Sequence, residues 1–324
     1  MLAGLCIAWG GATPFRSTSS RSTSRVGYYR TVVTARVAKN KLQFLRSEKL
    51  SAQAGVVHGF STRLGGVSRR YGGNALNLGF TEQDSSTAVQ RNRELFLRAL
   101  DAATGRKAWP LVSLRQIHSD LVHRVDSPPA ETLVGDGLIT DTPGLALGVQ
   151  TADCLPVILA DRKRRAVGVF HAGWRGTVKR IVEKGVGEMR THFGSDPRNI
   201  IAAIGPGVQS CCYEVGTEVR INFESQFAYG SSLFREVKES DPVREKYPLL
   251  FLTARAPGHS ELPVNIFLNL VEANRRQLLD AGVLARNIDS KFPCTACNTE
   301  LLFSYRAEKG ITGRMMAAVG IAPK

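Results

Sequence analysis

The chain has 324 residues, of which 43% are apolar and 22% are charged. This composition is typical of an ordinary globular protein with one large core or two modest ones. The sequence contains no apolar run that approaches the roughly 20 residues needed by a membrane-spanning helix, so we expect no membrane partner.

The formal net charge is +15, which on a folded body would suggest a nucleic-acid-binding protein. Much of this charge is concentrated at the start of the chain, because residues 1–41 hold five Arg and two Lys but no acidic side chain. Removing these residues leaves +8 on the rest of the chain. We therefore predict no nucleic-acid partner.

Residues 1–43 combine this basic charge with many Ser and Thr residues and an apolar opening, MLAGLCIAW. Such a composition is typical of an organelle transit peptide rather than of a fold. The Ser-rich segment with delayed Arg residues favours import into the plastid stroma, and the mitochondrion is the alternative. We expect residues 1–43 to be a disordered leader and 44–324 to form a single catalytic domain. A basic tail that touches RNA or membranes is the competing interpretation of the leader.

Short β-rich runs alternate with helical patterns in the remainder of the chain. In chain order, the predicted elements are a strand at 55–63 that leads into a Gly turn, a helix at 84–101, three buried strands at 145–151, 155–161 and 166–172, a helix at 177–193, a strand at 200–206 and a helix at 265–281. The three consecutive strands suggest a hairpin-like arrangement. This order predicts an α+β fold, a single layered domain with mixed β-sheets flanked by helices, rather than a doubly wound parallel sheet.

Three short motifs offer metal-binding side chains: RQIHSD at 115–120, TADCLP at 151–156 and FHAGWRG at 170–176. They contribute His118, Cys154 and His171, which lie 36 and 17 residues apart, so the fold must bring them together. Two imidazole nitrogens and one thiolate without an obvious fourth ligand predict an open, catalytic Zn²⁺ site rather than a structural one. Cu²⁺ is the alternative ion, because such a site binds it tightly.

Three polar residues near these motifs are candidates for substrate contacts or catalysis. Arg63, in STRLGG, and Arg175, just before a predicted helix, could each grip phosphate through two hydrogen bonds. A helix N-terminus also favours an anion. Asp153, beside Cys154, could act as a general base, as a partner of a ligand imidazole or as a ribose contact, and the sequence does not separate these roles.

Beyond the leader, the five cysteines do not resemble the disulfide framework of a secreted protein. Besides Cys154 they are Cys211 and Cys212, which are adjacent, and Cys294 and Cys297, which form a C-x-x-C motif. The adjacent pair could belong to a second metal site, but neighbouring side chains on a strand point to opposite faces, which favours structural thiols. A single C-x-x-C motif is weak evidence for a metal site.

A larger set of motifs resembles the YfiH-type family across residues 55–321. They are HGFSTRLGGVS at 58–68, NLG at 77–79, RQIH at 115–118, TADCLP at 151–156, HAGWRG at 171–176, IGP at 204–206, CCYEVG at 211–216, and LFSYR with TGR within 302–314. Members of this family were long labelled multicopper polyphenol oxidoreductases or laccase-domain proteins. They are now described as purine nucleoside phosphorylases with deaminase activity.

The resemblance implies that His118, Cys154 and His171 hold the metal, and it supports Asn77 as a contact to ribose or base. From the chemistry of the residues themselves we expect Cys154, His171 and Asp153 to be the catalytic residues. The resemblance also implies phosphorolysis of adenosine, inosine, guanosine and methylthioadenosine, together with deamination of adenosine. The predicted zinc site is compatible with deamination, because zinc can activate water for attack on C6 of a purine. Phosphorolysis additionally requires a basic pocket for phosphate.

Three other functions compete with this interpretation. A copper-binding polyphenol oxidase would build a copper cluster from H-x-H elements, but the chain has six His residues and no such element. A cysteine hydrolase would use a Cys154–His171 dyad and would keep working after chelation of the metal. A non-catalytic, protein-binding member of the family would be inactive on every purine nucleoside.

Overall fold

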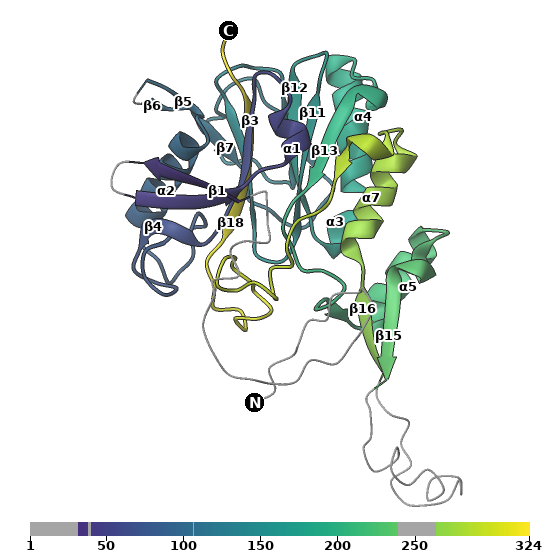
Figure 1. Cartoon of the computed structure of the whole chain (residues 1–324). Helices are drawn as coiled ribbons and strands as arrows, with labels where there is room; N and C mark the ends of the chain where they lie inside the picture. The colour runs from purple at the N-terminus through teal and green to yellow at the C-terminus, as the bar shows by residue number, and fades with distance from the viewer. Residues whose placement is uncertain (1–31, 38–39, 106, 239–263) are drawn as a thin grey trace, which may run out of the picture.

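Two six-stranded sheets form the centre of the computed structural model, which describes residues 32–37, 40–105, 107–238 and 264–324 (Figure 1). The first sheet has mostly antiparallel neighbours and one parallel pair, β10 with β7. Its strands, in spatial order, are β1 (Val32–Val37), β2 (Asn40–Leu45), β3 (Val56–Ser61), β18 (Met315–Ile321), β10 (Ala146–Thr151) and β7 (Leu111–Ser113).

The second sheet is antiparallel at its centre and parallel at both outer pairs. Its strands, in spatial order, are β17 (Ile288–Asp289), β13 (Ile200–Ile204), β11 (Leu155–Asp161), β12 (Ala166–Ala172), β9 (Gly137–Thr140) and β8 (Val122–Arg124). Both sheets are therefore mixed.

The sheets pack face to face, and helices cover their outer faces. Alternation along β11 shows this layering: Ile158 and Ala160 enter the core between the sheets, whereas Val157 and Leu159 face the helices. Helices α4 (Ile181–Phe193) and α7 (Leu270–Asp280) cover the second sheet, and α2 (Ser86–Ala99) covers the first (Figure 1). Strands buried on both faces explain the unbroken apolar runs in the sequence. The predicted α+β fold with layered mixed sheets is confirmed.

The remaining elements are short and lie around these layers. They are α1 (Glu48–Ser51), β4 (Leu64–Ser68), β5 (Ala103–Thr104), β6 (Lys107–Ala108), α3 (Trp174–Val178), α5 (Thr217–Gln226) and three 3₁₀ turns at Pro197–Asn199, Gly230–Leu233 and Ala285–Asn287. A third, small sheet has the order β14 (Glu214–Val215), β16 (Val264–Leu268) and β15 (Phe234–Lys238). Among the described residues, no helix is long and apolar enough to cross a bilayer.

Two predicted helices differ from those in the structure. The helix predicted at 177–193 is interrupted, because Arg180 adopts a left-handed conformation with φ of 63° between α3 and α4. The helix predicted from 265 begins only after Asn269, whose side chain caps its first turn. The apolar residues just before this cap form β16, which pairs with strands on both sides. A mostly apolar segment of five residues, VNIFL, fits either element when it is considered alone.

The three consecutive strands are also arranged differently from the prediction. Strands β11 and β12 form the expected antiparallel hairpin, but β10 belongs to the first sheet. The segment between β10 and β11 therefore crosses from one sheet to the other. The predicted Gly turn at 64–68 is strand β4. The helix predicted at 84–101 agrees with α2, which Ser85 caps.

Most of the predicted leader lies outside the described residues. Its last residues, however, belong to β2, which starts at Asn40 and pairs with β3. Leu42 on this strand is fully buried against α2. The folded part thus includes residues before the predicted boundary at 44, and the leader remains a prediction.

Candidate functional site

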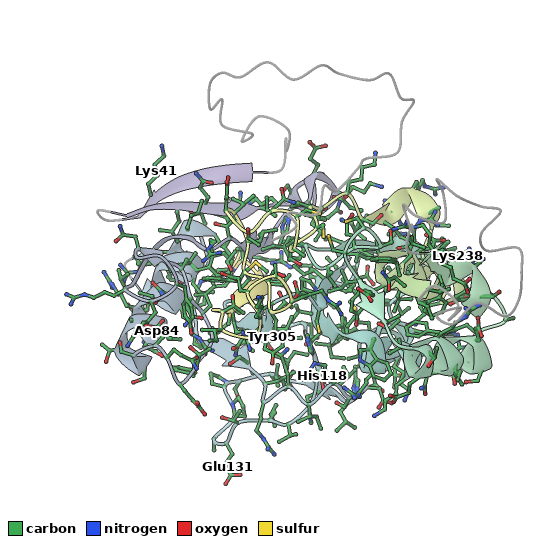
Figure 2. All side chains as sticks on the ribbon, turned by 90° about the horizontal axis from the view of Figure 1, so that it is seen from below. Lys41, Asp84, His118, Glu131, Lys238 and Tyr305 are labelled. Atoms are coloured by element: carbon green, nitrogen blue, oxygen red, sulfur yellow. The ribbon has the colours of Figure 1, made fainter. Side chains whose placement is uncertain are left out.

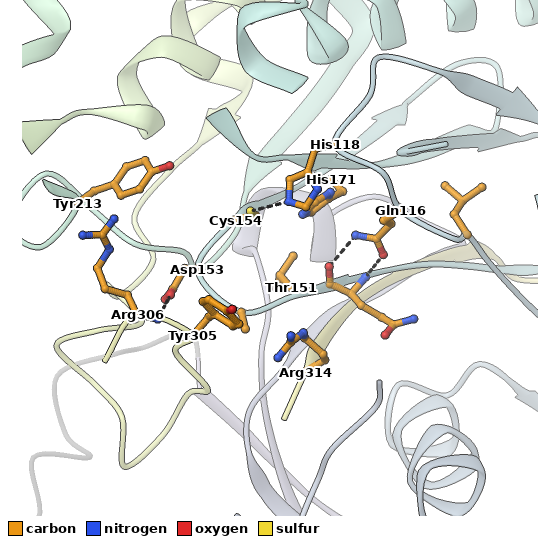
Figure 3. Close-up of a pocket in the computed structure, with 13 residues that line it drawn as sticks. Gln116, His118, Thr151, Asp153, Cys154, His171, Tyr213, Tyr305, Arg306 and Arg314 are labelled. Carbon is orange, nitrogen blue, oxygen red and sulfur yellow. Dashed lines mark hydrogen bonds between the residues drawn. The ribbon is translucent and has the colours of Figure 1, made fainter. Parts of the chain in front are cut away.

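A cavity of about 490 Å³ lies where the chain passes between the two sheets. Its size is within the range of small-molecule pockets. Seen from below, His118 and Tyr305 from its wall lie near the middle of the molecule (Figure 2). The lining residues are Leu114, Gln116, His118, Gln150, Thr151, Ala152, Asp153, Cys154, His171, Tyr213, Tyr305, Arg306 and Arg314 (Figure 3).

The three predicted metal ligands lie together in this cavity. His118 Nε2 is 3.9 Å from Cys154 Sγ, and the ring centroids of His118 and His171 are 4.8 Å apart. One ligand atom from each residue lies within 4.8 Å of the other two, a spacing that can hold one metal ion. Among the described residues, this group consists of these three side chains alone. Its donors fit Zn²⁺ with an open coordination position.

Different parts of the fold supply these ligands. His171 is the penultimate residue of β12, and Cys154 ends the crossing from β10 to β11. His118 belongs to the segment from β7 to β8, which also joins the two sheets, and its φ is 58°. A Cβ atom at Gly173 would lie 3.0 Å from both Cys154 Sγ and His118 Cδ2. Glycine at this position therefore allows the close approach of the ligands, whereas a Cβ atom would push against both side chains.

Asp136, which was not predicted from the sequence, holds the imidazole of His171 and the backbone turn that carries His118. Its carboxylate accepts a 2.8 Å hydrogen bond from His171 Nδ1, which leaves Nε2 as the nitrogen available to a metal. It also accepts backbone N–H groups of Ile117, His118 and Ser119 at 3.2, 3.0 and 2.6 Å. Carboxylates that hold ligand histidines in this way tune metal affinity. No motif around Asp136 signals this role, because it depends on contacts between distant segments.

The group is strongly coupled electrostatically. Burial opposes ionisation of Cys154, but the charge of His171 and a hydrogen bond from His118 lower the pKa of the thiol to about 6. Burial also opposes the charged form of His171, yet the Cys154 thiolate and Asp136 raise its pKa to about 9. Despite its own burial, Asp136 has a pKa lowered to about 2 by hydrogen bonds from His171 and Ser119. Without a cation, the site therefore holds a thiolate–imidazolium pair.

Asp153 organises the wall of the cavity. Its Oδ1 accepts hydrogen bonds from the hydroxyls of Thr295 and Ser304 at 2.6 and 2.7 Å, and its Oδ2 accepts the N–H of Arg306 at 2.7 Å. Its φ of 93° is unusual for a residue other than glycine. The carboxylate that contacts a ligand imidazole is that of Asp136. The contacts of Asp153 therefore favour neither a role as partner of a ligand imidazole nor a role as a general base. They indicate that Asp153 positions the loop at 295–306.

Two arginines in the cavity wall were not predicted as site residues, although both lie in motifs quoted above. The Arg306 guanidinium stacks 5.2 Å from the Tyr213 ring, and that of Arg314 lies 5.6 Å from the Tyr305 ring. Both residues line the cavity that contains the metal-binding group. An anion and an aromatic base could therefore bind on the same wall.

The three residues predicted to bind substrate, Arg63, Asn77 and Arg175, lie outside the cavity lining. Arg63 pairs with Glu308 at 3.0 Å and donates to the carbonyls of Thr299 and Tyr71. Asn77 is fully buried and accepts the N–H of Arg314 at 2.8 Å. Arg175 is exposed, with its guanidinium over the ring of Trp174. These contacts make Arg63 a structural residue and Asn77 a support for Arg314.

Comparison with known proteins identifies relatives of this chain. A purine nucleoside phosphorylase of Deinococcus radiodurans is 36% identical over 282 residues, which is 86% of this chain and 93% of the relative. The purine nucleoside phosphorylase YlmD of Geobacillus stearothermophilus is 33% identical over 82% of this chain and 90% of its own. The crystal structure of the Bacillus licheniformis protein YfiH superposes with a TM-score of 0.71 at 30% identity, covering 90% of this chain and all of that one.

A family model also matches most of the chain, over residues 57–322. Its description is "Multi-copper polyphenol oxidoreductase laccase", one of the labels of the YfiH-type family. With the relatives and the shared fold, this match confirms the resemblance found in the sequence motifs. The chain therefore belongs to the YfiH-like, laccase-domain family.

Proposed function

We propose that this protein is a zinc-dependent purine nucleoside phosphorylase that also deaminates adenosine. The observation that carries the proposal is one cavity that combines the His118–Cys154–His171 group with two arginines and two tyrosines (Figure 3). The names of its relatives support the phosphorylase part. The substrates we propose are adenosine, inosine, guanosine and methylthioadenosine, each with phosphate.

In phosphorolysis, a phosphate oxygen attacks C1′ of the ribose while the bond from C1′ to the purine nitrogen breaks. The electron pair of that bond stays on the purine, which takes up a proton, and the sugar leaves as its 1-phosphate: ribose 1-phosphate, or methylthioribose 1-phosphate from methylthioadenosine. Arg306 and Arg314 would bind the phosphate, and Tyr213 and Tyr305 would pack against the purine. When bound by His118, Cys154 and His171, Zn²⁺ would supply Lewis-acid chemistry and activate water for deamination.

Chromatography of reaction products tests the proposal. Purified, zinc-loaded protein is incubated with each nucleoside in the presence and absence of phosphate. Free base with the corresponding sugar 1-phosphate, formed only when phosphate is present, is expected for phosphorolysis. Inosine from adenosine without phosphate is expected for deamination. A protein inactive on all four nucleosides would instead support the non-catalytic alternative.

Two substitutions connect this activity to the cavity. Cys154→Ala should abolish both activities and lower the zinc content, because it removes the thiolate from the metal-binding group. Arg314→Gln should raise the KM for phosphate about tenfold or more, since it removes a charged contact. Arg190→Gln, on the exposed side of α4, is the matched control. It should leave the KM for phosphate and both activities unchanged.

The thiolate–imidazolium pair formed by Cys154 and His171 favours a second candidate, a cysteine hydrolase. The two candidates differ in their response to chelation. Removal of the metal should abolish the proposed phosphorylase and deaminase activities, and zinc should restore them. A hydrolase dyad would remain active after the same treatment. Loading with Cu²⁺ and assaying a phenolic substrate tests the polyphenol oxidase alternative.

A further inference from the structure

Four cysteines outside the cavity form a second cluster of possible ligands. Cys211 and Cys212 follow β13, and Cys294 and Cys297 lie between β17 and β18. The four sulfur atoms all lie within 4.8 Å of one another. Cys297 Sγ is 3.5 Å from Cys211 Sγ and 3.3 Å from Cys212 Sγ. The fold thus joins two short motifs that are more than 80 residues apart.

The adjacent cysteines reach the same partner loop because they occupy a turn. The N–H groups of Cys212 and Tyr213 both donate to the carbonyl of Gln209, at 2.9 and 2.8 Å. Structural thiols were expected because neighbouring side chains on a strand face opposite ways. In this turn that reasoning does not apply, and both sulfurs point toward Cys297.

The C-x-x-C segment presents its first sulfur to backbone donors. The N–H of Gln209 lies 3.4 Å from Cys294 Sγ, and the N–H groups of Ala296 and Cys297 also donate to it. Backbone donors directed at a sulfur stabilise its thiolate, which is the form that binds a metal. The two loops are also joined through their backbones, since Thr295 donates its N–H to the carbonyl of Gly207.

We propose that Cys211, Cys212, Cys294 and Cys297 bind a single Zn²⁺ ion at a second site, separate from the His118–Cys154–His171 group. Zn–S bonds of about 2.3 Å in a tetrahedron place the sulfurs about 3.8 Å apart, close to the spacing of this cluster. In the reduced protein, four cysteine thiolates would favour Zn²⁺ or iron among common metals, and a closed set of four is characteristic of structural zinc.

This site would hold the two loops that form one wall of the cavity. Tyr213, which lines the cavity, follows Cys212 directly, and Thr295, which donates to Asp153, follows Cys294. The cation would therefore fix the positions of Tyr213 and, through Asp153, of the loop that carries Arg306. Its role is to position these groups, not to take part in the reaction.

Metal analysis of the full chain, prepared with a reducing agent and excess Zn²⁺, tests the proposal. We expect about two zinc ions per wild-type chain. The Cys294→Ser/Cys297→Ser variant should retain about one, as should His118→Ala, whereas the combined variant should lose nearly all. Activity should disappear in His118→Ala even though its cysteine cluster remains loaded. Loss of activity and loss of the second ion are thereby measured separately.

A spectrum of the wild-type protein keeps the test decisive if the serine variants fail to fold. Replacement of zinc by Co²⁺ should give the intense visible absorption and the sulfur charge-transfer bands of a tetrahedral cobalt thiolate site, in His118→Ala as well as in the wild type. A stoichiometry of one ion that the serine substitutions do not alter would overturn the proposal. So would bound iron, or a disulfide between the two loops in the reduced, metal-loaded protein, detected by alkylation and mass spectrometry.

Discussion

Asp136 shows how one side chain controls two ligands at once. Its carboxylate accepts a hydrogen bond from His171 Nδ1 and another from the backbone N–H of His118. One fully buried carboxylate therefore holds the imidazole of His171 and the backbone that carries His118. Ligand orientation at this site is set by an acid that does not itself join the metal-binding group.

Asp136→Asn should weaken metal binding about 10–100-fold. The amide NH₂ of asparagine would face N–H groups whose hydrogen bonds the carboxylate now accepts, so donor would meet donor. Competition with a chromogenic chelator measures the change. Asp120→Asn is the matched control: it lies in the same segment, but Asp120 pairs with Lys184 at the surface. Equal metal affinities in the wild type and Asp136→Asn would contradict the assigned role.

Gly173→Ala should also weaken metal binding, in this case through steric contact. The backbone of Gly173, with φ of −71°, accepts alanine without strain, so the added Cβ acts only through Cys154 and His118. Gly187→Ala on α4 meets no atom within 4 Å and should leave metal binding unchanged while stabilising the helix by about 0.5–1 kcal/mol. Metal titration and thermal unfolding of both variants test this contrast. Unchanged affinity in Gly173→Ala would show that the ligands need no such close approach.

At the scale of elements, His58 joins β3 to the start of α1. Its Nε2 accepts the N–H of Ser47, the cap of α1, and the side chain is 2% exposed. Burial and the nearby charge of Arg46 lower the pKa of His58 to about 3, whereas the unfolded chain has the ordinary value of 6.5. This histidine therefore has a structural role, distant from the cavity lining.

The pKa of His58 predicts an acid-dependent loss of stability. Above pH 6.5 neither state of the chain is protonated at His58, and the full stability is present. As the pH falls from 6.5 toward 3, the unfolded chain binds a proton that the folded chain excludes, which costs about 1.4 kcal/mol per pH unit. His58→Gln keeps an acceptor for Ser47 and lacks this titration, so it should lose less stability in acid. Urea unfolding of both proteins at neutral and acidic pH measures the difference; parallel curves would refute it.

For the whole molecule, local motifs predicted some features and contacts between distant segments determined others. The apolar runs of β11 and β12 identified buried strands, and three motifs identified His118, Cys154 and His171. The assignment of β10 to the other sheet depends on its pairing with β18, more than 160 residues later. Asp136 and the cluster at Cys211 depend in the same way on segments that meet only in the folded chain.

The leader is a further prediction for the whole molecule. Residues 1–43 fused to a fluorescent protein should direct it to plastids in plant cells, because their composition is that of a transit peptide. The full chain without residues 1–31, which retains the β1–β2 hairpin, is the control and should stay outside plastids. Mitochondrial fluorescence would support the alternative destination, and diffuse fluorescence would reject the leader.

The crossing segments that supply His118 and Cys154 have a kinetic consequence. Each joins a strand of one sheet to a strand of the other, so the ligand triad is complete only after the sheets have docked. A nascent chain would therefore acquire the proposed ion late, through the mouth of an already formed cavity. Because its ligands come from segments that join the two sheets, a bound ion would stabilise their docked arrangement.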